Sequence, residues 1–187
     1  SASGRPGVDT AYSEDQMKVG RKLANKLLNV TKFVLTFPAA DAAIPLAEAV
    51  TDPIDLSMLA KLDEVIAAAT AGFDAFDYAR ALDRTESFFW WFCDNYVELV
   101  KGRAYNSHGL EAANSALRAL REALGSVQRL LAPMIPFTTE EAWSWWNTAS
   151  VHGAAWPRPG QLTGDASLID PVIDTLAHVR RAKTEAK

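Results

Sequence analysis

Apolar residues recur at helical spacing along most of this 187-residue chain, and the pattern predicts an all-α protein. The first predicted helix covers residues 13–37 and opens at a capping box, Ser13 to Gln16. Its expected core stripe consists of Val19, Leu23, Leu27, Val30 and Val34. Asp52-Pro53 is a capping residue followed by a proline at the first helical position, which predicts a second helix that ends near Gly72.

Aromatic residues dominate the third predicted helix, which runs from Asp74 and Asp77 to about Arg103. The expected stripe consists of Phe76, Phe89, Trp90, Cys93, Tyr96, Val97 and Val100, with Phe88 and Phe92 beside it. A helix that is apolar around much of its circumference is usually central in a bundle. We therefore interpret these rings, and Trp143, Trp145 and Trp146, as core packing rather than as a platform for stacked bases.

The remaining elements complete a helical bundle with a C-terminal appendage. A fourth helix, capped by Asn106 or Ser107, should carry Leu110, Leu117, Leu120, Leu124, Val127 and Leu131 and end before Pro133. Thr138 to Glu141 predicts a capping box and a short helix, residues 150–156 predict one short strand, and Asp170-Pro171 predicts a last helix. The expected organisation is a linker at 1–12, a bundle at 13–147 and an appendage at 148–187.

The composition bears on several classes of protein. A net charge of -4 argues against a protein that coats nucleic acid without specificity, since such domains are usually basic. The single cysteine, Cys93, excludes an internal disulfide framework and agrees with a reducing cytosol. Charges or prolines interrupt every apolar stretch, so no membrane-spanning helix and a cytoplasmic location are expected. Without a signal peptide or initiator methionine, the chain is interpreted as a segment of a longer protein.

The sequence carries little that indicates catalysis. His108, His152 and His178 stand far apart, without the spacing of metal ligands, so no metal site is expected. Cys93 falls on the core stripe and is interpreted as a buried, inert thiol. Neither a nucleophile elbow nor a glycine loop for phosphates occurs, and we expect no catalytic site in this chain.

The charge pattern of the first helix is the informative feature. The stretch between Gln16 and Ala40 contains five basic residues and no acidic residue. The basic residues are Lys18, Arg21, Lys22, Lys26 and Lys32. Helical spacing places one face opposite the Leu23 stripe, formed by Lys18, Lys22, Asn25, Asn29 and Lys32. Cations can neutralise phosphates, asparagines can hydrogen-bond sugars or bases, and Phe33 beside them could stack on an unpaired base. A solvated lysine-rich face explains the same pattern, and charge alone leaves both interpretations open.

Four motifs in order along the chain resemble the anticodon-binding domain of class I valyl-tRNA synthetases. The first helix fits that family's N-K-L-x-N-x-x-[KR]-F-V-L pattern after a glycine-basic pair, at Gly20, Arg21, Asn25, Lys26, Leu27, Asn29, Lys32, Phe33, Val34 and Leu35. An aromatic run followed by C-D-x-Y-x-E-x-x-K ends at Lys101, a P-x-x-P-F-x-T-E-E-x-W turn starts at Pro133, and Trp156-Pro157 completes the series.

The resemblance implies a helical bundle of the class Ia synthetase type that grips the anticodon stem and loop of tRNA(Val). It also implies upstream catalytic and editing domains that use ATP and Mg²⁺ to join valine to tRNA, whereas no cofactor is expected in this chain. Lys18, Arg21, Lys22, Lys26 and Lys32 would contact phosphates, while Asn25, Asn29 and Phe33 would face loop nucleotides. Arg80, Arg84 and Lys101 are further candidates on the third helix.

Three other functions remain open at this point. The chain could be the matching domain of an isoleucyl-, leucyl- or methionyl-tRNA synthetase, which competition between purified tRNA species would separate. A helical protein-interaction module would show an exposed apolar groove and no salt-sensitive RNA affinity. A cofactor-holding bundle would use the aromatic cluster, and a colourless, metal-free protein would exclude it.

Overall fold

The computed structural model describes residues 13–38, 44–160 and 163–185, and these residues form helices without a strand. The elements, in chain order, are α1 (Glu14–Leu35), α2 (Leu46–Ala49), α3 (Pro53–Asp74), α4 (Tyr78–Trp91), the π-helical turn η1 (Phe92–Tyr96), α5 (Val97–Ala104), α6 (Leu110–Leu131), α7 (Pro136–Ser144), the 3-10 turn η2 (Val151–Gly153) and α8 (Asp170–Glu185). The prediction of an all-α bundle is confirmed. The predicted linker at 1–12 lies outside the described residues.

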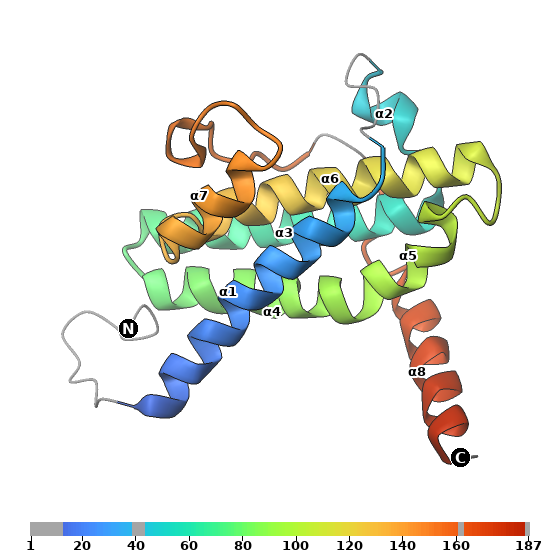
Figure 1. Ribbon diagram of the computed structural model, residues 1–187, viewed down its shortest axis with the longest axis horizontal. Coiled ribbons are helices and arrows are strands. Elements are labelled where there is room, and N and C mark those ends of the chain that lie inside the picture. The colour runs from blue at the N-terminus through green and yellow to red at the C-terminus, as the bar shows by residue number, and fades with distance from the viewer. Residues whose placement is uncertain (1–12, 39–43, 161–162, 186–187) are drawn as a thin grey trace.

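The long helices pack into one bundle, and α8 leaves it. Helices α3 and α6 lie side by side, α4 continues through η1 into α5 along them, and α1 crosses the bundle diagonally (Figure 1). Helix α7 packs on both α1 and α6. Helix α8 projects from the bundle beside α5 and contains no buried residue (Figure 1).

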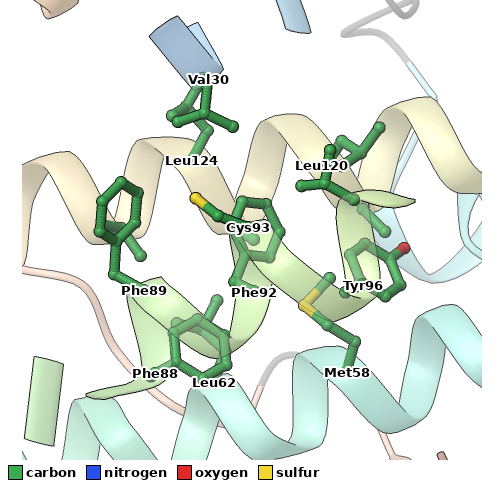
Figure 2. Packing of buried hydrophobic residues seen from close by; sticks show 14 of the residues in the cluster. Val30, Met58, Leu62, Phe88, Phe89, Phe92, Cys93, Tyr96, Leu120 and Leu124 are labelled. Carbon is green, nitrogen blue, oxygen red and sulfur yellow. The ribbon is translucent and has the colours of Figure 1, made fainter. Parts of the chain in front are cut away.

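Aromatic rings of α4 and η1 fill the centre, as the sequence predicts. Phe89, Phe92 and Tyr96 are fully buried, and Figure 2 shows them between α6 and α3, where Leu124 and Met58 lie. Cys93 lies in the same layer, and burial raises the pKa of its thiol to about 12. The thiol therefore stays protonated at neutral pH, which agrees with the predicted inert cysteine.

Three expected core residues are exposed. The exposed fraction is 41% for Val19, 70% for Phe76 and 71% for Leu110. Val19 lies in the second turn of α1, Phe76 follows the end of α3, and Leu110 begins α6. At these positions the helical spacing of apolar residues continues, but the side chains stay exposed. Phe76 terminates α3 in a left-handed conformation with φ 57°, and the Asp77 N–H donates to the Gly72 carbonyl across this turn (2.8 Å).

The caps separate correct predictions from wrong ones. Asp52 caps α3 by accepting from the Ile54 N–H (2.9 Å), and Asp77 caps α4. The predicted cap of the fourth helix at Asn106 or Ser107 is wrong, because α6 begins after Gly109, whose φ of 91° favours glycine. The capping box at 138–141 is also wrong: α7 already begins at Pro136.

The strand predicted at 150–156 is wrong, because the described residues there form the 3-10 turn η2 and extended chain. The Glu140 carboxylate accepts hydrogen bonds from the Ser150 hydroxyl (2.9 Å) and the Val151 N–H (3.0 Å). The Ser150 hydroxyl in turn accepts from the His152 N–H (3.2 Å). These contacts satisfy the backbone locally, and no described element offers a strand to pair with.

Candidate nucleic-acid interface

Helix α1 has one buried face and one exposed face. Leu23, Leu27, Val30 and Val34 are at most 5% exposed and pack into the core. Thr31 joins them, since its hydroxyl donates to the Leu27 carbonyl and accepts from Gln128 of α6 (3.1 Å). This packing fixes the rotation of α1, and the opposite face therefore points to solvent.

Most of the predicted binding residues lie on that exposed face, which we call the α1 surface. The exposed members are Lys18, Arg21, Lys22, Asn25, Asn29 and Lys32. Lys18 forms an exposed ion pair with Asp15 at 3.0 Å. Among the residues that the structure describes, no carboxylate lies within ion-pair distance of Arg21 or Lys22. Their charges are thus available to an anion.

On one flank the α1 surface meets η1 and α5. The Lys26 ammonium pairs with the Asp94 carboxylate at 2.8 Å, and it lies 5.9 Å from the ring centroid of Trp90. The hydrogen bond that the Lys26 ammonium donates to the Asp94 carboxylate raises the pKa of Lys26 and outweighs partial burial, which lowers it. Further along, Lys101 lies 5.7 Å from the ring centroid of Phe33, so α5 brings a predicted residue to this flank.

The other flank of the α1 surface meets α7. The Lys32 ammonium lies 5.5 Å from the ring centroid of Trp145, within the range of a cation–π contact. The indole N–H of Trp145 donates to Glu141 (3.0 Å), which fixes the ring. Trp145 is half-buried, so this flank combines a cation with an accessible aromatic ring.

The structure does not bring every predicted residue together. Arg80 and Arg84 are exposed on α4, and the contacts described for them do not join them to the α1 surface. Conversely, the predicted binding residues did not include Asp94 or Arg180, and Trp145, expected from the sequence to pack in the core, lies half-buried beside Lys32. Arg180 of α8 donates to the backbone carbonyl of Asp94 (3.1 Å), which ties α8 to the flank of α1. Contacts this distant in sequence leave no signal in helical periodicity.

The described residues contain no group of three or more histidine, cysteine, aspartate and glutamate side chains able to hold a metal ion. In the same residues no helix is long and apolar enough to cross a membrane. The chemistry that remains on the α1 surface is that of cations, amides and rings facing solvent, which suits binding of a phosphate-bearing polymer.

Comparison with known proteins also indicates a domain that binds RNA. A family model described as the anticodon-binding domain of tRNA ligase matches residues 55–187, a range that starts after α1. Valine–tRNA ligase of Salinispora arenicola is 51% identical over 207 residues, covering the whole chain and 24% of the relative. Those of Thermobifida fusca (51% over 192 residues) and Cutibacterium acnes (48% over 191 residues) also cover the whole chain and 22% of each relative. The chain thus spans about a quarter of the length of these curated relatives.

Proposed function

Because the chain belongs to the family of anticodon-binding domains of tRNA ligases, we propose that it binds the anticodon arm of tRNA(Val) through the α1 surface. The proposal rests on one observation: a cationic face of α1 points to solvent in a protein whose net charge is -4. RNA binding by an acidic protein requires its cations to be concentrated on one surface, and α1 supplies such a concentration.

The proposed contacts divide by chemistry. Lys18, Arg21, Lys22, Lys26 and Lys32 approach phosphates, with Arg21 and Lys22 contributing most because no described carboxylate neutralises them. Asn25, Asn29 and Phe33 face loop nucleotides, and Lys101 extends this part of the surface. Arg80 and Arg84 are proposed as contacts for a more distant part of the stem, since they lie apart from the α1 surface.

The proposal extends to the protein of which this chain would be a quarter. In a cytoplasmic valine–tRNA ligase the catalytic and editing domains would use ATP and Mg²⁺, and this chain would hold the anticodon arm without catalysing a reaction. The relatives named above are all valine–tRNA ligases, which favours valine over isoleucine, leucine or methionine. Competition by the corresponding purified tRNA species tests this choice: tRNA(Val) should displace a labelled anticodon stem-loop of tRNA(Val) at the lowest concentration.

The test of the α1 surface is a binding titration with an anticodon stem-loop of tRNA(Val) at several salt concentrations. Arg21→Glu should weaken binding about tenfold or more and reduce the slope of log K against log salt by about one. Arg158→Glu is the matched control, because this substitution makes the same change in net charge as Arg21→Glu. Arg158 is exposed on the loop beside α2, α3 and α6. Equal effects of the two substitutions, or none from either, would refute an interface on α1.

A further inference from the structure

The π-helical turn η1 interrupts an otherwise continuous helix from α4 to α5 and places Asp94 on the flank of the α1 surface. Phe92, Cys93 and Tyr96 of this turn point into the core, whereas Asp94 is exposed. A π-helical turn is a rare interruption of an α-helix and occurs frequently at functional sites. The local irregularity thus coincides with a carboxylate beside the basic surface.

Two elements distant in sequence hold Asp94 in place. The Lys26 ammonium of α1 binds one carboxylate oxygen at 2.8 Å, and Arg180 of α8 donates to the backbone carbonyl at 3.1 Å. The Trp90 ring supports the ammonium from one side. Lys26 and Asp94 consequently present a donor and an acceptor next to each other at a fixed position.

Stability does not account for this pair. The Asp94 side chain is 60% exposed and the Lys26 side chain 34%, and exposed ion pairs contribute little to folding. On a surface that binds phosphates, a carboxylate lowers the affinity for every RNA, because it repels the backbone. A specific contact of Asp94 with part of the RNA would offset this repulsion.

We propose that Asp94, together with Lys26, recognises the Watson–Crick edge of one unpaired loop nucleotide whose base is adenine or cytosine. An ionised carboxylate only accepts hydrogen bonds, so Asp94 takes the exocyclic amine of adenine or cytosine, and Lys26 donates to the unprotonated ring nitrogen beside that amine. Uracil in the same position would turn its O4 carbonyl towards the carboxylate and its N3–H towards the ammonium, so neither contact could form. This inference rests on the proposed RNA binding by α1 and assigns Lys26 to a base rather than to a phosphate.

The experiment is a titration of the 187-residue chain and its Asp94→Ala variant against one anticodon stem-loop and a panel in which each loop nucleotide is replaced by uridine. The unmodified chain should discriminate against uridine at one position by about tenfold or more. Asp94→Ala should abolish discrimination at that position and weaken binding of the stem-loop that carries no uridine replacement. If Asp94→Ala instead tightens binding of every hairpin by the same factor, Asp94 merely screens Lys26 and the inference is wrong.

Glu98→Ala is the matched control, since Glu98 is an exposed carboxylate about one turn further on that pairs with Lys101 at 3.8 Å. It should change all affinities slightly and equally, and a loss of discrimination at the same position would contradict the assignment to Asp94. Arg21→Glu in the same panel separates this inference from its premise. If Arg21→Glu weakens binding while Asp94→Ala tightens binding of every hairpin equally, only the inference about Asp94 is refuted. If neither variant changes binding, the proposed RNA binding by α1 is refuted as well.

Discussion

Asp55 and Asp94 are both ion-paired aspartates, but they lie in contrasting surroundings. Asp55 of α3 is fully buried and accepts hydrogen bonds from the Tyr96 hydroxyl (2.7 Å), the Ser115 hydroxyl (2.7 Å) and both terminal nitrogens of Arg103. Asp94 is 60% exposed, and within the described part of the chain its carboxylate pairs with one cation, the Lys26 ammonium. The buried carboxylate of Asp55 is thus fully used by partners within the bundle, whereas the carboxylate of Asp94 remains accessible at the surface.

The difference follows from the cost of removing a charge from water. A buried carboxylate is tolerated only when cations and donors satisfy its oxygens, because each unsatisfied lone pair loses its hydration without replacement. Asp55 therefore joins α3 to η1, α5 and α6, and burial together with Asp55 holds the pKa of Tyr96 well above its usual range. Asp94 keeps its hydration, so it can exchange water for a ligand.

The largest expected effect is the loss of the buried charge. Asp55→Asn places an amide among donors and removes one of the two carboxylates that pair with Arg103, the other being Asp52, so the free energy of unfolding should fall by about 3–5 kcal/mol. Urea denaturation followed by circular dichroism measures this change. Asp94→Asn is the control and should change stability by less than about 1 kcal/mol. Similar losses for both variants would remove the distinction drawn between the two aspartates.

A smaller effect is expected at the hydroxyl that completes the Asp55 site. Ser115 donates to Asp55 and accepts from the backbone N–H groups of Thr51 (3.2 Å) and Asp52 (3.1 Å). Ser115→Ala leaves these partners unsatisfied and should cost about 1–3 kcal/mol in urea denaturation. Ser144→Ala, which removes an exposed hydroxyl that donates to the Glu141 carbonyl, should change the free energy of unfolding by no more than about 0.5 kcal/mol. If the two serines behaved alike, the buried network would not be a unit.

The fold was largely predictable because helical periodicity and caps are local signals. Asp52-Pro53 fixes the start of α3, and the Leu23 stripe fixes the inward face of α1. The failures at Phe76 and at residues 150–156 have another origin. Which side chain a neighbour covers, and whether Glu140 will hold a turn, depends on tertiary contacts that periodicity does not contain.

The candidate site was predictable only in part, for the same reason. The basic residues of α1 share one face, and helical geometry alone places them there. The partner of Lys26 is 68 residues away, on a π-helical turn that breaks the helical period, so the sequence pattern could not identify Asp94. Sequence therefore located the cations, whereas the carboxylate among them required the structure.

The smallest effect expected is the energetic coupling within the exposed pair itself. Lys26→Met keeps an apolar stem beside Trp90 while removing the charge, and Asp94→Asn removes the partner charge. A double-mutant cycle in urea denaturation should give a coupling of about 0.2–1 kcal/mol, which should shrink as salt is added because both groups are accessible to ions. A coupling of several kcal/mol that persists in high salt would mean that this pair holds α1 on the bundle. Asp94 would then belong with Asp55, and its availability to a nucleotide would be lost as an explanation.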